Sequence, residues 1–176
     1  MRTRVVVVAT IAGLLTFGVT LPALADSGTT TASVTVTSGA LSITVPAAAG
    51  SLGTTANSVD GSVINGQLGQ VQVLDARSAA AGSGWVTSVI STAFTPASGP
   101  TIAASLVGYT AGAITKTGTA TYTANNPADL TGVVPAVTAT GITGDNSATW
   151  NPTINVTVPG GTVAGTYSGM ITHSVL

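Results

Sequence analysis

The sequence predicts an all-β fold, a single antiparallel β-sandwich of the immunoglobulin-like or jelly-roll-like kind. Apolar residues alternate with Ser and Thr along several short runs, which is the pattern of strands with one buried face. Val, Ile and Thr are abundant, and β-branched side chains favour a pleated surface. After residue 25, no window of about eleven residues carries a helical stripe. Short strands separated by frequent turns favour a sandwich over a barrel.

The predicted strands are the alternating runs, which in chain order are 32–37, 41–45, 70–73, 115–123, 153–158 and 166–175. In the last run, alternation places one set of side chains on a common face, namely Tyr167, Gly169, Ile171, His173 and Val175. Between the runs stand residues that favour turns. The predicted turns are Asp60-Gly61, Asn65-Gly66, Asn125-Asn126-Pro127, Gly144-Asp145-Asn146 and Gly160-Gly161.

The first 25 residues have the features of a secretory signal peptide. Arg2 and Arg4 form a positive start, residues 5–19 form an apolar run, and residues 21–25 end in an A-x-A cleavage site. An uncleaved membrane anchor is the alternative, but a spanning helix needs about 20 apolar residues and this run is shorter. We therefore expect a signal peptide at 1–25 and one exported domain at 26–176, with no membrane span after cleavage.

Charged side chains are rare, and this limits the functions open to the protein. Only 5 % of the 176 residues are charged, against roughly 25 % in an ordinary soluble domain. After the predicted signal peptide the only cations are Arg77 and Lys116, too few to bind nucleic acid through its phosphates. The chain has no Cys and a single His, so we expect no disulfide, no metal site and no cofactor. The composition indicates a non-catalytic protein.

Two segments of the chain carry a family resemblance. The first reads V-x-D-x-R followed by G-W, and its matching residues are Val73, Asp75, Arg77, Gly84, Trp85 and Val89. The second lies near the end of the sequence, and its matching residues are Tyr167, Ile171, Thr172 and Val175. Together they resemble the WxL domain of Gram-positive surface proteins, although Thr87 and His173 stand where that family carries Leu and Trp. The resemblance implies a secreted β-sandwich attached non-covalently to the peptidoglycan of the cell wall.

The candidate ligand-binding residues are three aromatic side chains and one cation: Trp85, Trp150, Tyr167 and Arg77. A Trp ring buries a large area in a core, and it also offers a flat face to a sugar. The sequence leaves both roles open for each Trp. The other motif residues are expected to be structural, and they are Asp75, Gly84, Ile171, Thr172, His173 and Val175.

Two of these motif positions have specific expected partners. Asp75 and Arg77 stand two residues apart on one face of a strand, which favours an ion pair or turn-closing hydrogen bonds over ligand contact by the guanidinium. His173 shares its face with Ile171 and Val175, so we expect a buried, neutral imidazole that is hydrogen-bonded to the backbone.

The leading hypothesis is an exported, non-enzymatic, WxL-like protein of the cell surface that contacts peptidoglycan, another surface glycan or another surface protein. The alternative is a self-associating structural subunit of a surface layer or fibre, because few charges protect its strand edges. A hydrolase that combines a Ser, His173 and an Asp is the weakest option, because the sequence contains no G-x-S-x-G turn.

Overall fold

The computed structural model describes residues 30–176, so the predicted signal peptide lies outside the described residues. Contacts within the chain separate two units, Met1–Thr35 and Val36–Leu176, and the strands belong to the second. Of the first unit, residues 30–35 carry no helix or strand. Over the described part of the chain, no helix is long and apolar enough to cross a membrane.

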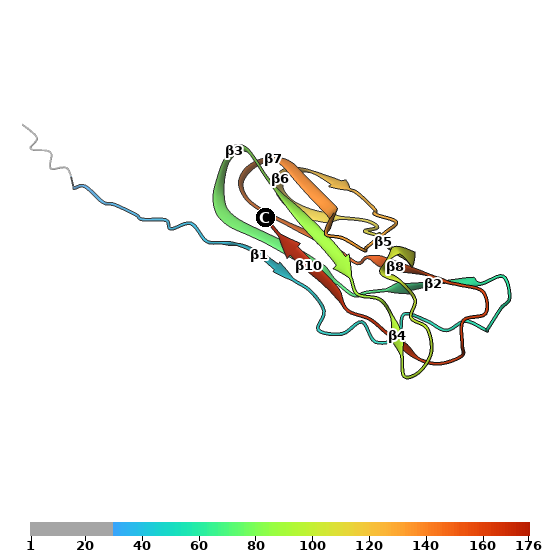
Figure 1. The fold of residues 1–176 in the computed structure, drawn as a ribbon. Coiled ribbons are helices and arrows are strands. Elements are labelled where there is room, and N and C mark those ends of the chain that lie inside the picture. The colour runs from blue at the N-terminus through green and yellow to red at the C-terminus, as the bar shows by residue number, and fades with distance from the viewer. Residues whose placement is uncertain (1–29) are drawn as a thin grey trace, which may run out of the picture. The chain divides into compact units, whose positions relative to one another are not determined.

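The folded unit is built from antiparallel strands, which confirms the predicted all-β class (Figure 1). In chain order the strands are β1 (Leu41–Thr44), β2 (Ser62–Gln67), β3 (Val71–Ser91), β4 (Thr95–Pro96), β5 (Val107–Thr110), β6 (Thr115–Ala124), β7 (Val134–Trp150), β8 (Thr153–Val158), β9 (Tyr167–Ser168) and β10 (Ile171–Val175). Within residues 30–176 the helical structure is limited to a short 3-10 helix, η1 (Ala104–Leu106). The sheets pack against each other around an apolar core, as in a β-sandwich.

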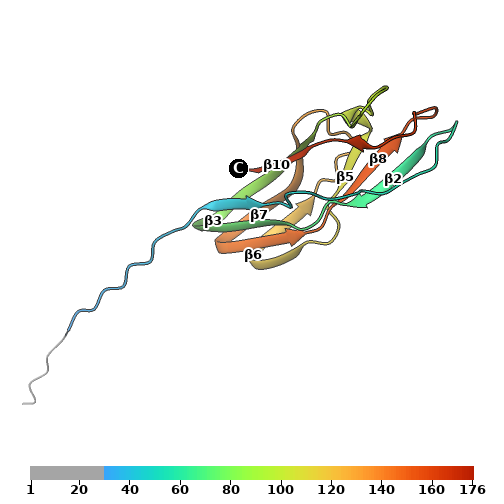
Figure 2. The ribbon, with the colours of Figure 1, turned by 90° about the horizontal axis from the view of Figure 1, so that it is seen from below.

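The largest sheet has five strands, in the order β1-β3-β7-β6, with β10 also paired to β3. Both β1 and β10 pair with β3 but with different parts of it, since Leu41 lies opposite Asp75 and His173 lies opposite Val89. A three-stranded sheet, β2-β8-β5, and a two-stranded sheet, β4-β9, complete the fold. Figure 2 shows β6 on the outer side of β7, where it ends the largest sheet.

β3 and β7 are unusually long, at 21 and 17 residues, and their ladder contains several irregularities. The register shifts repeatedly between Asp75 and Trp85, over a segment made mostly of small residues. On β7, Gly144 has a φ of 72°, a conformation in which glycine avoids the steric cost paid by other residues. The turn predicted at 144–146 is therefore wrong, because this glycine serves a bulge inside a continuous strand.

The turn predicted at Asn65-Gly66 is also wrong, because both residues lie inside β2. Gly66 is needed there for close packing, since a Cβ at this position would overlap the carbonyl oxygen of Leu52. The turns at 125–127 and 160–161 fall outside the strands, as predicted.

The alternating run at 32–37 is not a strand, in contrast to the sequence prediction. Val34 and Val36 are 90 % and 86 % exposed, and no strand pairs with this segment in the described part of the chain. Alternation specifies which faces a strand would have, but a strand also needs a hydrogen-bonding neighbour. The runs at 41–45, 115–123 and 153–158 do have such neighbours, and they form β1, β6 and β8.

The core lies between the sheets and contains both tryptophans. Its largest fully buried side chains are Trp85, Tyr109, Leu130, Ile142 and Ile154. The strand alternation predicted from the sequence is visible in β8, where Ile154 and Val156 are buried, and in β10, where Ile171, His173 and Val175 are half-buried between exposed neighbours.

Candidate functional site

The first sequence motif forms a hydrogen-bonded ion pair where β3 becomes irregular. Arg77 Nε donates to Asp75 Oδ1 at 2.8 Å and Arg77 Nη2 donates to Asp75 Oδ2 at 3.0 Å, so the pair is bidentate. Arg77 Nη2 also donates to the carbonyl oxygen of Gly84 at 3.3 Å. The guanidinium therefore bonds to both parts of the first motif, the segment around Asp75 and the segment that begins at Gly84.

Asn146 of β7 extends this pair into the core. Its Nδ2 donates to Asp75 Oδ2 at 3.1 Å, and its Oδ1 accepts from Trp85 Nε1 at 3.0 Å and from the Tyr122 hydroxyl at 3.2 Å. We call Asp75, Arg77, Trp85, Tyr122 and Asn146 the Asp75 network. It satisfies the indole nitrogen and a carboxylate that is fully buried by surface area.

Electrostatics in the Asp75 network favour a charged carboxylate. The hydrogen bond from Arg77 holds the pKa of Asp75 below its ordinary value, against the opposing effect of burial. Burial, with a contribution from the charge of Asp75, raises the pKa of the Tyr122 phenol. The preference for an Asp75–Arg77 ion pair is therefore confirmed, and the pair stabilises the irregular part of the β3–β7 ladder.

Trp85 and Trp150 are each only 2 % exposed, so neither ring can serve as a surface platform for a sugar. The ligand-binding role considered for them is corrected to a role in the core, where each indole N–H also has a hydrogen-bond partner. Arg77 keeps an exposed side chain, but its donors are directed at Asp75 and Gly84.

The second motif meets the other tryptophan in a smaller cluster. Trp150 Nε1 donates to the Tyr109 hydroxyl at 2.7 Å, and His173 Nε2 lies 3.3 Å from the same oxygen. The expectation of a backbone partner for His173 is thus wrong, because the side chain finds this hydroxyl across the core. Burial lowers the pKa of His173 to about 4 and raises that of Tyr109 to about 12, so both are neutral at pH 7.

This neutrality assigns the hydrogen bond in the cluster. The Tyr109 oxygen already accepts from Trp150, and its own hydrogen has no other acceptor among the described residues. The hydroxyl therefore donates to an unprotonated Nε2, which places the imidazole hydrogen on Nδ1. Residues 30–176 contain no group of three or more His, Cys, Asp or Glu that could hold a metal ion.

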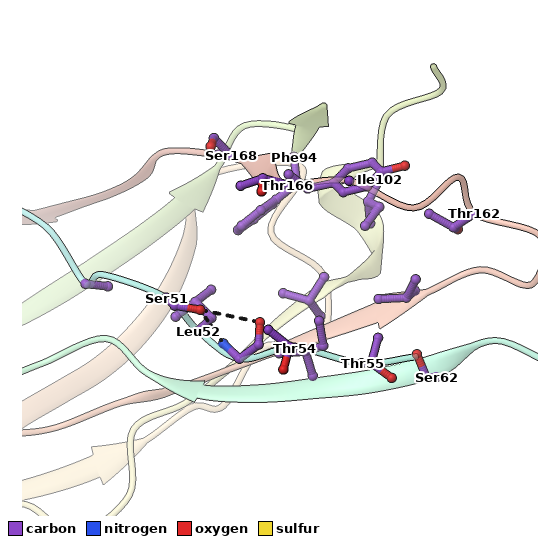
Figure 3. A pocket seen from close by; sticks show the side chains of 18 of the residues that line it. Ser51, Leu52, Thr54, Thr55, Ser62, Phe94, Ile102, Thr162, Thr166 and Ser168 are labelled. Carbon is purple, nitrogen blue, oxygen red and sulfur yellow. Dashed lines mark hydrogen bonds between the residues drawn. The ribbon is translucent and has the colours of Figure 1, made fainter. Parts of the chain in front are cut away.

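The described residues form an open groove of about 850 Å³. One wall is the loop 46–58 together with the start of β2, and the other is the segment 162–171, which contains β9. Figure 3 shows the two walls facing each other, with Leu52, Thr54 and Ser62 on one side and Phe94, Thr166 and Ser168 on the other. We call this cavity the β2–β9 groove.

No ionisable side chain other than the Tyr167 phenol lines the β2–β9 groove. Its apolar lining includes Ile64, Ile102 and Val156, and its polar lining consists mainly of Ser and Thr hydroxyls. Within this lining, Ser62 Oγ is buried and has no hydrogen-bond partner among the described residues. The groove therefore suits a neutral ligand that presents its own hydrogen-bonding groups.

The backbone adds to this hydrogen-bonding capacity. Residues 46–57 of the loop make no backbone–backbone hydrogen bond with the other described residues. At the end of the loop, the carbonyl oxygen of Ser58 accepts a hydrogen bond from Gly161 N–H at 3.0 Å. Within the loop, the Ser51 hydroxyl is hydrogen-bonded to both backbone groups of Gly53, and the Thr55 hydroxyl donates to the carbonyl oxygen of Ala56. The loop backbone groups that have no such partner are able to bind an extended ligand.

Of the four candidate ligand-binding residues, Tyr167 lines the groove and the other three do not. Its hydroxyl donates to the carbonyl oxygen of Val163 at 2.8 Å, which holds the ring within the wall. Sequence reasoning missed the loop 46–58, whose signal is a run of Ala, Gly, Ser and Thr with no alternation and no charge.

Comparisons with family models, curated proteins and solved structures found no match for this chain.

Proposed function

We propose that the protein is an exported, non-catalytic, WxL-like component of a Gram-positive cell surface, and that it associates with peptidoglycan through the β2–β9 groove. The observation that carries the proposal is the chemistry of the groove, which combines apolar side chains, hydroxyls and a loop without backbone–backbone hydrogen bonds, and has no charged side chain. The signal-peptide features and the two sequence motifs support the location.

The neutral parts of peptidoglycan match such a lining. Sugar hydroxyls and acetamido groups donate and accept hydrogen bonds without charge, so they can pair with the loop backbone and with exposed hydroxyls such as those of Thr54 and Thr166. Methyl groups of the acetamides and of the stem peptides can contact Ile64, Ile102 and Val156 on the groove floor.

Co-sedimentation with purified peptidoglycan tests the proposal. The exported protein is expected to pellet with the polymer to nearly the same extent at 0.05 M and at about 1 M salt, because screening weakens contacts between charges and the groove has none. Absence of the protein from the pellet at both salt concentrations would remove the binding claim. Release by high salt would assign the binding to a different, charged surface.

Paired substitutions locate the contact. Thr54→Asp places a charge in the groove, and it is expected to reduce co-sedimentation at least about tenfold, because a ligand would bury that charge unpaired. Thr157→Asp is the matched control, since Thr157 is an exposed threonine of β8 that does not line the groove. Equal losses in the two variants would argue against the groove.

A further inference from the structure

The segment 32–37 has the sequence of a strand but no strand neighbour. Ala32, Val34 and Val36 alternate with hydroxyl residues, and the two valines are almost fully exposed. Such a segment presents unpaired backbone groups together with an apolar face, which is the chemistry of a strand that lacks a sheet.

The fold contains a strand edge that could pair with such a segment, namely the outer edge of β6. β6 has ten residues and pairs with β7 alone, and it is the longest strand of the described fold with one side open. The bulges around Gly118 interrupt its first half, and Thr121–Ala124 pair regularly with β7. This second half offers a straight row of backbone groups to an added strand.

The usual protection of a sheet edge is weak on β6. The strand contains no Pro, and its one charged residue is Lys116. Lys116 Nζ lies 5.9 Å from the centre of the Tyr122 ring, so the ammonium is drawn over a side chain of its own strand. The backbone of Lys116 lies before Gly118, outside the regular half of the edge, and its charge reaches that half only through the Tyr122 ring.

The two faces of β6 fit the two faces of the segment. Ala120, Tyr122 and Ala124 are half-buried, whereas the threonines between them are exposed. An added strand with Val34 and Val36 on the first face would cover the aromatic and alanine side chains, and its own hydroxyls would lie beside the threonines. We propose that the edge of β6 binds the segment 32–37 of a second copy of this chain, so that copies join head to tail.

The connection to β1 explains why the donor is a second copy. Gly39 N–H donates to the carbonyl oxygen of Ala76 at 2.6 Å, which fixes residue 39 on the β3 edge of the sheet. An added strand beyond β6 would lie four strand spacings away, roughly 19 Å. Thr37 is two residues from Gly39 and can reach roughly 7 Å. Because the donor and acceptor surfaces differ, the contact does not close on itself and produces a chain of subunits.

Cross-linking tests the contact directly, because the chain contains no Cys. Thr35→Cys and Thr121→Cys protein are prepared separately, mixed, and treated with a short bismaleimide linker. The mixture is expected to give a covalent heterodimer at least about tenfold faster than Thr35→Cys mixed with Thr157→Cys, because Thr157 lies on β8, which is paired on both sides. Equal rates would overturn the proposal. Faster cross-linking of Thr35→Cys to Thr54→Cys would also overturn it, by placing the segment in the β2–β9 groove.

Sedimentation velocity tests the assembly with the full exported protein. The unmodified protein and Val59→Asp are expected to grow in size with concentration, whereas Val36→Asp stays monomeric. Val59 is the control because it is 92 % exposed and lies outside the segment, and neither substitution disturbs a packed side chain. A monomeric unmodified protein at the highest concentration, or a Val36→Asp variant that still assembles, would refute the proposal.

Discussion

Asp75 is buried in a chain with few charges, and its environment explains how this is tolerated. Two donors of the Arg77 guanidinium and the amide of Asn146 contact its two oxygens. A buried charge of this kind depends on its partners, and removal of one partner costs more than removal of the charge itself. The two residues of the ion pair are therefore unequal in their contributions to stability.

We expect Arg77→Gln to destabilise the protein by about 2–4 kcal/mol at pH 7, and Asp75→Asn by about 1–2 kcal/mol. The first variant leaves a carboxylate in the core, whereas the second leaves an exposed guanidinium in water. Urea unfolding of each variant and of the double variant measures the difference. A larger loss in Asp75→Asn than in Arg77→Gln would contradict this account of the network.

The same pair has a defined pH dependence. Because the folded state lowers the pKa of Asp75, its contribution to stability is complete above the ordinary value of 3.8 and declines as the pH falls further. In Arg77→Gln that contribution is lost, so the stability difference between the variant and the unmodified protein should shrink below about pH 4.

The lowered pKa of His173 predicts that the stability of the protein also depends on pH in a second range, separate from that of Asp75. The unfolded chain binds a proton near pH 6.5, but the half-buried imidazole of the folded protein does so only near pH 4. Stability should therefore be constant above about pH 7 and should fall between pH 6.5 and 4 by at most about 3 kcal/mol. His173→Gln should abolish this fall, because the chain has no other His. Urea unfolding of both proteins across this range measures the fall, and an unmodified protein with constant stability would contradict the lowered pKa of His173.

At the scale of the elements, the strands that were predicted correctly from the sequence are those that have both an alternating pattern and a neighbouring strand to pair with. β8 and the second half of β6 combine strict alternation with a regular partner, and their burial follows the pattern. The two wrong turns contain Gly next to Asn or Asp, which locally favours a turn. In the fold, these glycines instead serve a bulge in β7 and a close contact in β2, which only tertiary packing specifies.

In the candidate site, too, some contacts were predictable from the sequence and others were not. The ion pair of Asp75 and Arg77 was predictable, because its two residues lie on one strand. The partners Asn146 and Tyr109 were not. Asn146 is placed by the register of β7 against β3, and Tyr109 comes from β5 of the other sheet, which faces Trp150 only after the sheets have packed. The groove was also not predictable, because its walls are joined by topology and carry no alternation or charge.

Gly66 of β2 packs against Leu52, which belongs to the loop that lines the proposed binding groove. Gly66→Ala should push Leu52 away from β2, because the new methyl group overlaps the Leu52 carbonyl oxygen. We expect a loss of stability of about 1–3 kcal/mol and a parallel loss of peptidoglycan co-sedimentation. Gly132→Ala is the matched control, since nothing lies within 4 Å of a Cβ at that glycine. Normal binding by the Gly66→Ala variant would show that the loop 46–58 is not part of the binding surface.

At the scale of the whole molecule, the two proposals use different surfaces of one charge-poor domain. The β2–β9 groove lies between β2 and β9, whereas the assembly contact uses β6 and the segment 32–37. A chain of subunits would carry one groove per copy. Binding of one groove then raises the effective concentration of the next groove at the same polymer, so assembly strengthens attachment without any new contact.

This coupling predicts a specific asymmetry between two variants. Val36→Asp should keep an intact groove and bind peptidoglycan as a monomer, with an apparent affinity at least about tenfold weaker than that of the unmodified protein. Thr54→Asp should lose binding and yet assemble normally, because Thr54 lies in the groove and not on β6. Titration of peptidoglycan by co-sedimentation, with sedimentation velocity on the same samples, measures both properties. Unchanged apparent affinity in Val36→Asp would uncouple assembly from attachment, and loss of assembly in Thr54→Asp would show that the two surfaces are not separate.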